Sequence, residues 1–288
     1  MTLAEPNGQG DLFSSVDEHE VQLVRPAGTS RPIWAVYGGG RYLGTVSAER
    51  DGNAVPVWRV LATREEHDSL DDAIRAMRRP PSWRRERERV SRWARHLLAD
   101  DSLLAVDLET TGLDNAYMVQ IAVMDRDESV LLDEYVRPRA AIEPAALEMH
   151  GITQKRVARA ATFGELLPAL TDVLHGRTLV SYNSESPRAV FQRELVRHHG
   201  DPVAAAEWLA RCRWKDAMMP YSVWRGLWSV ERGAYRSQPL GGPHDAAVDC
   251  QFVLAKLRQM ADGVPDDGWA LSWDQPLAGT DPDRRPLD

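Results

Sequence analysis

An apolar run that ends in two alternating carboxylates is the feature that most constrains this chain. Residues 103–106 read as a buried strand, and Asp107 and Glu109 follow in the sequence LLAVDLE. Side chains alternate with a period of two along a strand, so both carboxylates project from one face. Adjacent anions are unfavourable unless a cation lies between them, and hard oxygen ligands suit Mg²⁺ or Mn²⁺. Taken alone, the same pattern also fits a strand that ends in solvated acids.

The segments around this strand predict an α/β domain. Strand-like runs cover residues 103–109, 119–124, 130–136 and 179–183, and helical segments precede and follow the last of them. Short connections between the first three runs predict antiparallel pairing, whereas the helices before the fourth predict that it joins in parallel. We therefore expect a mixed sheet flanked by helices over residues 99–262.

The N-terminal part predicts a separate and smaller module. Residues 33–46 read as a hairpin with three consecutive glycines at its turn, and residues 55–62 read as a third strand. Ser69 caps a helix that a Pro-Pro pair ends. These segments predict a β-β-β-α module over residues 21–81, and its sequence does not disclose a function.

Residues 82–98 predict an arginine-rich amphipathic helix that links the two domains. Between Arg75 and Arg95 nine arginines stand against two glutamates, although the whole chain has a formal net charge of −8. The apolar stripe of this helix favours a solvated helix packed on the following domain. The basic cluster leaves contact with nucleic acid open as the alternative.

Composition limits the remaining classes of protein. No stretch approaches the roughly 18 apolar residues that a membrane span needs, and the first twenty residues are acidic and polar rather than a secretory signal. Cys212 and Cys250 are too few for a disulfide framework or a four-ligand zinc site. We expect a cytoplasmic protein with no membrane partner, and disordered tails at residues 1–20 and 263–288.

Four segments resemble the motifs of the DEDDh (DnaQ-like, RNase T-like) 3′→5′ exonucleases. DLETTGLD at residues 107–114 resembles the first motif, and HDAAVD at residues 244–249 resembles the third motif, His-x-x-x-x-Asp. EMHGIT at residues 148–153 and LVSYNSE at residues 179–185 resemble landmarks between them. The resemblance covers about 160 residues. It implies an RNase H-like exonuclease fold and hydrolysis of DNA or RNA from the 3′ end to nucleoside 5′-monophosphates.

The resemblance also implies a role for each candidate site residue. The catalytic set would be Asp107, Glu109, His244 and Asp249. Its three carboxylates would bind Mg²⁺ or Mn²⁺ in a two-metal site, and His244 would be the general base. The pocket for the 3′-terminal nucleotide would be lined by Thr110, Gly112 and Leu113. The implied partner is a single-stranded nucleic-acid 3′ end, and a protein partner or a homodimer is left open.

The chain departs from the family pattern where a carboxylate for the second metal is expected. Family members have aspartate at the position of Pro187, and Glu185 is the nearest acid that could replace it. Ser186 followed by Pro187 predicts a helix start with Ser186 as N-cap. The segment AYRSQPLGGPH before the third motif is also short, which affects how His244 is oriented.

These departures leave three functions open. The first is a metal-dependent 3′→5′ exonuclease, weakened or specialised by the loss of the aspartate. The second is a catalytically silent module that binds nucleic-acid 3′ ends or a protein partner. The third is a scaffold that keeps only the nuclease fold.

Overall fold

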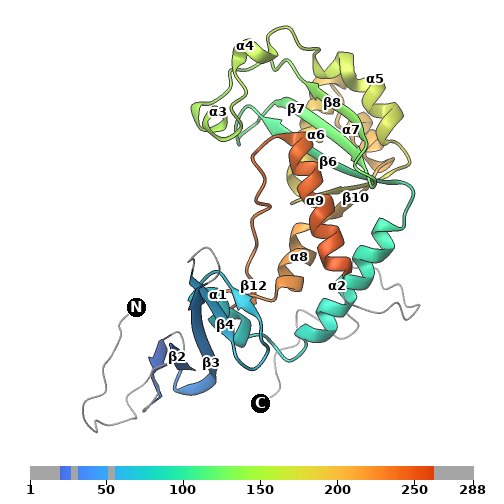
Figure 1. Cartoon of the computed structure of the whole chain (residues 1–288). Helices are drawn as coiled ribbons and strands as arrows, with labels where there is room; N and C mark the ends of the chain where they lie inside the picture. Colours follow the sequence, from blue (N-terminus) through green and yellow to red (C-terminus); the bar gives the residue numbers. More distant parts are fainter. Residues whose placement is uncertain (1–19, 27–31, 51–55, 263–288) are drawn as a thin grey trace. The chain divides into compact units, whose positions relative to one another are not determined.

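The computed structural model describes residues 20–26, 32–50 and 56–262 (Figure 1). The tails expected at residues 1–20 and 263–288 lie outside the described residues, apart from Glu20. The chain divides into two compact units, Met1–Arg84 with Arg225–Arg236, and Arg85–Trp224 with Ser237–Asp288. None of the helices within the described ranges combines the length and apolar character that crossing a membrane requires.

The smaller unit contains an antiparallel five-stranded sheet with helix α1 (Leu70–Met77) packed against it. Its strands follow one another in chain order: β1 (Val21–Val24), β2 (Ile33–Gly38), β3 (Arg41–Arg50), β4 (Pro56–Val60) and β5 (Glu66–His67). The expected three strands and helix are present, and the Ser69 side chain accepts the N–H of Asp72 as predicted for an N-cap. The edge strands β1 and β5 are additional, because segments this short carry little periodic signal.

The segment Arg225–Arg236 belongs to this smaller unit although it follows the sheet of the larger unit in the chain. It forms a hairpin of β11 (Trp228–Ser229) and β12 (Ala234–Tyr235). Nε of Arg79 donates to the carbonyl oxygen of Gly226 at 2.8 Å, and Nη1 of Arg236 donates to Oδ1 of Asp72 at 2.9 Å. These long-range bonds, rather than any local pattern, fix the hairpin.

The larger unit is built on a mixed five-stranded sheet. The strand order is β10-β9-β6-β7-β8, and the strands are β6 (Leu103–Thr110), β7 (Met118–Asp125), β8 (Val130–Tyr135), β9 (Thr178–Ser181) and β10 (Arg213–Asp216). β6, β7 and β8 pair in antiparallel fashion, whereas β9 lies parallel to both β6 and β10. The expected α/β fold with a mixed sheet is confirmed, and β10 extends it by one strand that was not predicted.

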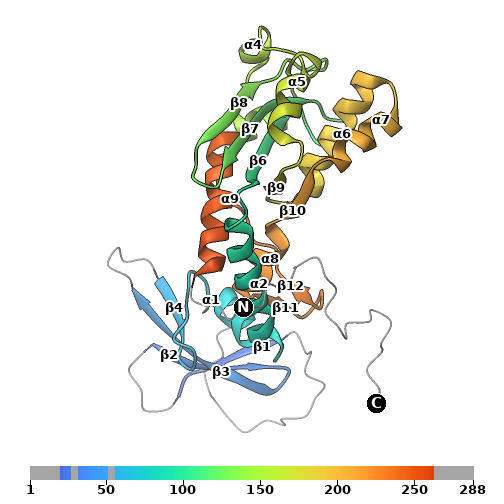
Figure 2. The ribbon, with the colours of Figure 1, turned by 90° about the vertical axis from the view of Figure 1, so that its right-hand side faces the viewer.

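Helices cover both faces of this sheet (Figure 2). One face packs against α5 (Phe163–Leu174), α6 (Glu185–His199) and α7 (Pro202–Ala210), with Phe191 and Leu170 fully buried between them. Helix α9 (Ala246–Ala261) packs against β6 and β7 from the opposite face. Helix α2 (Trp83–Leu98) lies near the C-terminal end of α9 in both views (Figures 1 and 2). The remaining helices are α3 (Pro144–His150), α4 (Gln154–Val157) and α8 (Met218–Arg225).

The arginine-rich helix α2 has the predicted apolar stripe. Val90, Trp93, Ala94 and Leu97 are buried. Arginines occupy its other positions, and they are exposed or half-buried. The stripe therefore accounts for how the helix packs, and contact of its arginines with nucleic acid stays a prediction.

Candidate active site

Three side chains that are distant in the sequence converge at the end of β6. Glu109 lies on β6, His244 lies just before α9, and Asp249 lies in the first turn of α9. One ligand atom from each of these residues lies within 4.8 Å of the other two. Glu109 and Asp249 are buried, whereas His244 is exposed. The fold thus brings together three of the four expected catalytic residues in one potential metal-binding group.

The fourth residue, Asp107, lies beside this group. It precedes Glu109 by two positions on β6, so the two side chains project from the same face of the strand. Burial, followed by the charges of Glu109 and Asp249, raises the pKa of the Asp107 carboxyl well above its usual range. Asp107 is therefore electrostatically coupled to both carboxylates of the group.

The carboxyl groups of this cluster favour protonation in the absence of a cation. Burial and then the charges of Asp249 and Asp245 raise the pKa of Glu109 to about 7. Burial also raises the pKa of Asp249, although His244 opposes the shift. Oδ1 of Asp249 is buried and has no hydrogen-bond partner among the described residues. A buried carboxylate oxygen without a donor is unfavourable and calls for a ligand.

The peptide before α9 packs directly onto the Asp249 carboxylate. A Cβ atom at Gly242 would lie 1.7 Å from Oδ1 of Asp249, so a side chain at this position would collide with the carboxylate. His244 has a positive φ of 60°, which is uncommon for a residue other than glycine. The Asp245 side chain then caps α9 by accepting the N–H of Val248 at 3.1 Å. The short connection therefore places His244 at the cluster.

Gln120 supports the start of α9 and was not predicted from the sequence. It is buried on β7, directly opposite Glu109 in the strand register. Its Oε1 accepts the N–H of Ala246 at 3.4 Å, and its Nε2 donates to Oδ1 of Asp133 at 3.0 Å. A single amide inside the apolar strand MVQIAVM was the available signal, because buried polar side chains need partners.

The loop after β6 carries the predicted substrate-binding residues. Oγ1 of Thr110 donates to the carbonyl oxygen of Gly112 at 2.7 Å. A Cβ atom at Gly112 would lie 2.2 Å from Cδ of Glu143, so the backbone approaches that side chain closely. The Leu113 side chain is 91% exposed, which leaves its apolar surface open to a ligand.

His150 fixes the start of this loop, a role that the EMHGIT segment alone did not reveal. Nδ1 of His150 accepts the N–H of Ile152 at 3.0 Å, which leaves the proton of a neutral imidazole on Nε2. Nε2 lies 3.0 Å from the carbonyl oxygen of Thr110 and donates to it. Burial lowers the pKa of His150 and so favours this neutral form, although the bond to Thr110 opposes the shift.

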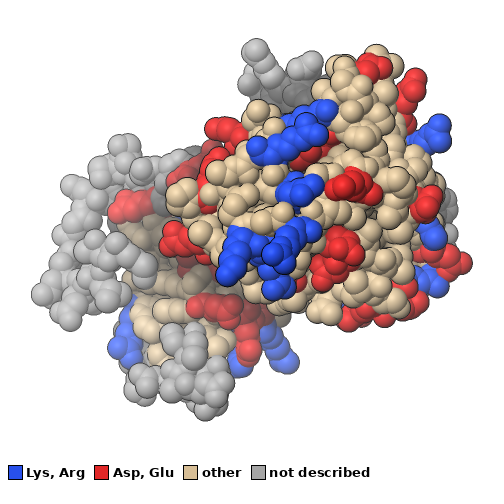
Figure 3. Space-filling view, turned by 90° about the horizontal axis from the view of Figure 1, so that it is seen from above, with Lys and Arg blue, Asp and Glu red and all other residues tan. Residues whose placement is uncertain are grey.

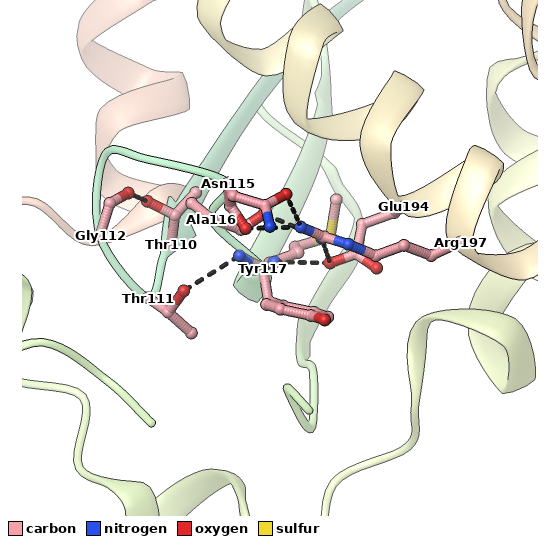
Figure 4. Close-up of polar contacts among 9 residues, drawn as sticks. Thr110, Thr111, Gly112, Asn115, Ala116, Tyr117, Glu194 and Arg197 are labelled. Carbon is pink, nitrogen blue, oxygen red and sulfur yellow. Dashed lines mark hydrogen bonds and ion pairs between the residues drawn. The ribbon is translucent and has the colours of Figure 1, made fainter. Parts of the chain in front are cut away.

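Glu194 and Arg197 of α6 hold the other end of the same loop (Figure 4). Nη2 of Arg197 donates to Oδ1 of Asn115 at 2.7 Å, and Nη1 donates to the carbonyl oxygen of Ala116 at 3.0 Å. The guanidinium lies 3.6 Å from the centroid of the Tyr117 ring. Glu194 is buried, and its Oε1 accepts the Met118 N–H at 3.0 Å and Nη1 of Arg197 at 3.3 Å.

The start of α6 corrects one prediction. The helix begins at Glu185 with Ser184 as N-cap, so the predicted N-cap at Ser186 is wrong. Ser184 makes no side-chain cap bond. Instead, Oδ1 of Asp216 on β10 accepts the N–H groups of Asn183 and Ser184 at 2.9 and 3.2 Å. These bonds from another strand fix the two residues that precede the helix, which a local serine-proline pattern cannot show.

The expected second-metal position contains no carboxylate. Pro187 is buried in the first turn of α6, and Glu185 is exposed. Within the described part of the chain, the potential metal-binding group consists of Glu109, His244 and Asp249 and does not include Glu185.

The fold and the site together define a class of protein. An acidic pair on the central strand of a mixed sheet, joined by a histidine and an aspartate at the start of a packed helix, is the arrangement expected of a DEDDh exonuclease domain. Residues 104–207 match the family model RNase T, described as an exonuclease. Residues 104–207 therefore form an RNase T/DEDDh exonuclease-family domain, as the motifs predicted.

Individual relatives are similar over the same part of the chain. The uncharacterized exonuclease CP81 of Escherichia phage 186 is 28% identical over 187 residues, which cover 60% of this chain and 95% of that protein. Exonuclease X in complex with 5′ overhanging duplex DNA is 24% identical, with a TM-score of 0.37, and the match covers 55% of this chain and 90% of that one. Exonuclease I of E. coli in complex with a dA16 oligonucleotide is 20% identical, with a TM-score of 0.41, and the match covers 57% and 42% of the two chains.

Proposed function

We propose that this protein is a metal-dependent 3′→5′ exonuclease that hydrolyses phosphodiester bonds of DNA or RNA and releases nucleoside 5′-monophosphates. The observation that carries the proposal is the convergence of Glu109, His244 and Asp249 within 4.8 Å, next to Asp107. Asp107 and Glu109 lie within residues 104–207, which match an exonuclease family model.

The donor set suits a hard divalent cation. Oδ1 of Asp249 is buried without a partner, and two further carboxyl groups lie close to it. Carboxylate oxygens are the ligands that Mg²⁺ and Mn²⁺ prefer. We assign Asp107, Glu109 and Asp249 as the residues that would hold such an ion. When bound, it would activate a water molecule and neutralise charge on the phosphate.

The side chains around the cluster have separate roles in the proposed reaction. The exposed imidazole of His244 accepts the proton of the attacking water, because the peptide that includes Gly242 holds it beside the carboxylates. Thr110 and Gly112 orient the 3′-terminal nucleotide through the loop that His150 fixes. Leu113 offers an apolar contact to the terminal base, since its side chain is almost fully exposed.

A catalytically silent module that binds 3′ ends or a protein partner is the second candidate. The observation that favours it is the buried Pro187 at the position where the family has an aspartate, with Glu185 exposed beside it. Without that carboxylate a second metal ion loses a ligand, and the leaving 3′-oxygen loses stabilisation.

The test is release of mononucleotides from a single strand of about 20 nucleotides that is labelled at its 5′ end. Wild-type protein with Mn²⁺ should shorten the strand stepwise from its 3′ end, and the Glu109→Gln variant should leave it intact. Equal digestion by both proteins would contradict the proposal. An intact strand that nevertheless binds the folded wild type would select the silent module.

A further inference from the structure

A cavity of about 470 Å³ lies behind the loop that Glu194 and Arg197 hold. Its walls come from that loop, from the segment after β8, from the start of α5 and from the end of α6. Arginines outnumber acids in its lining: Arg137, Arg139 and Arg197 stand against Glu165 and Glu194. A cavity of this size and charge suits an anionic ligand.

Both acids of the cavity already have partners. Oε1 of Glu194 accepts hydrogen bonds from Met118 and Arg197. Oε2 of Glu165 accepts the N–H and the hydroxyl of Thr162 at 2.7 and 2.8 Å in the capping box of α5. Both carboxylates are therefore hydrogen-bonded within the protein, and Glu165 in addition forms a longer ion pair with Arg137.

Arg137 and Arg139 keep most of their donors for a ligand. Nη2 of Arg137 lies 3.8 Å from Oε2 of Glu165, which is too long for a hydrogen bond. Within the described ranges, the Arg139 side chain has neither a hydrogen bond nor an ion pair, and both arginines are exposed. By contrast, the guanidinium of Arg197 donates to Asn115, Ala116 and Glu194 and is held by the loop.

The surface at this end of the larger unit has a group of cations among acidic side chains (Figure 3). Figure 3 looks onto the end where α3, α4 and α5 lie in Figure 1, and lysine and arginine side chains gather near the middle of that face. The chain as a whole has a formal net charge of −8. A group of positive charges on an acidic protein is a place where a polyanion would approach.

One wall of the cavity is the back of the predicted substrate loop. Tyr117 lines the cavity, and its N–H donates to Oγ1 of Thr111 at 3.0 Å. Thr111 lies between Thr110 and Gly112, which we assign to the 3′-terminal nucleotide. The loop that would bind the 3′ end is therefore also a wall of the cavity.

We propose that Arg137 and Arg139 bind backbone phosphates of the substrate strand upstream of its 3′-terminal nucleotide. Guanidinium groups suit this role because they bind phosphate oxygens through two parallel charge-assisted hydrogen bonds. Tyr117 and Arg197 form the fixed wall against which the strand is held. The assignment rests on the proposed function, since it takes the loop at Thr110–Leu113 as the binding site of the 3′ end.

The test compares two double variants that remove the same charge. Arg137→Ala with Arg139→Ala alters the cavity. Arg177→Ala with Arg211→Ala is the control, because both residues are exposed and precede the starts of β9 and β10, at the opposite end of the sheet. Thermal melting establishes that each variant is folded.

Binding is measured by fluorescence anisotropy, with Ca²⁺ in place of Mn²⁺ so that turnover does not interfere. For a labelled single strand of about 20 nucleotides, the cavity variant should have a Kd about tenfold higher than wild type and a salt dependence reduced by about two counterions. The control pair should change this Kd less than about twofold. A trinucleotide, which contacts the loop but hardly extends beyond it, should bind the wild type and the cavity variant alike.

Three results would overturn the proposal. One is an unchanged Kd of the long strand for the cavity variant. Another is an equal loss in the control pair, since the effect would then reflect net charge alone. The third is a loss of inorganic phosphate binding by calorimetry without any loss of strand binding, which would identify a free anion as the ligand. An inactive wild type would contradict the proposed function, while the affinities would still decide the role of the arginines.

Discussion

Glu194 and the pair Glu109 and Asp249 are all buried carboxyl groups of one compact unit, yet the fold surrounds them differently. Glu194 accepts hydrogen bonds from the Met118 N–H and from Arg197. Glu109 and Asp249 lie close together near Asp107, and Oδ1 of Asp249 has no partner among the described residues. Burial raises the pKa in both places, so the neighbours rather than the burial distinguish them. Protein atoms supply the hydrogen bonds that Glu194 needs, whereas the cluster of Glu109 and Asp249 needs a ligand.

The largest expected effect comes from a change in the acidic cluster of Glu109 and Asp249. Asp249→Asn removes a ligand of the proposed metal, so we expect nucleotide release to fall at least about 1,000-fold, beyond the roughly 10–100-fold effect of an outer-shell contact. The metal-free variant should melt at a higher temperature than wild type, because it has one fewer buried like charge. Asp262→Asn, exposed at the end of the same helix, is the matched control. Near-normal activity in Asp249→Asn would contradict the ligand assignment.

The next largest effect comes from removing Arg197, the cationic partner of Glu194. Arg197→Ala leaves Glu194 buried without its counter-charge and frees residues 115–117, so the free energy of unfolding should fall by about 3 kcal/mol. Urea denaturation measures this loss, and Arg188→Ala, exposed on the same helix, should change it by less than about 0.5 kcal/mol. Mn²⁺ should stabilise wild type and Arg197→Ala by similar amounts. A loss equal to that of the Arg188 variant would show that Glu194 needs no cationic partner.

The pH dependence of the free energy of unfolding tests the acidic cluster separately from Glu194. The pKa of Glu109 is about 7 in the folded protein against an ordinary value of 4.5, so the folded state binds more protons between these values. Stability of the metal-free protein should therefore fall as pH rises from about 4.5 to about 7, by on the order of 2 kcal/mol. Melting in a chelator at several pH values measures the slope. Glu109→Gln should flatten it, and a slope that is equally steep in this variant would assign it to another group.

The smallest expected effect concerns the missing carboxylate. Pro187→Asp should raise Mn²⁺-dependent nucleotide release about tenfold, because it restores a ligand where the family has one. Asp is also favourable in the first turn of α6, close to the positive end of the helix dipole. Arg188→Asp, exposed at the next position, adds the same carboxyl group away from the site and serves as control. An active wild type that Pro187→Asp does not improve would mean that the second ligand is dispensable or comes from elsewhere.

Local patterns in the sequence predicted much of the larger unit. Period-two runs located β6 to β9, and the connections between them predicted the mixed pairing. The spacing of Asp107 and Glu109 predicted that they share a face, which the strand shows. That His244 and Asp249 approach Glu109 followed only from the resemblance to a family, because no local rule joins β6 to α9.

The features that were missed depend on contacts between distant segments. Gln120 and His150 bond backbone groups of other segments, and the sequence around them does not show which groups those are. The hairpin in Arg225–Arg236 consists of two-residue strands fixed by Arg79 and Asp72. The wrong N-cap at Ser186 has a similar origin, since Asp216 on β10 fixes the backbone before the helix.

The bonds from Asp216 fix the chain that leads into α6 independently of the side chains at residues 184–187. Oδ1 of Asp216 accepts the N–H groups of Asn183 and Ser184, and Ser184 makes no side-chain cap bond. Pro187 lies in the first turn, where a backbone N–H has no partner within the helix, so exchange of an aspartate for proline there removes no helical hydrogen bond. Asp216 is then the residue on which the position of this helix start depends.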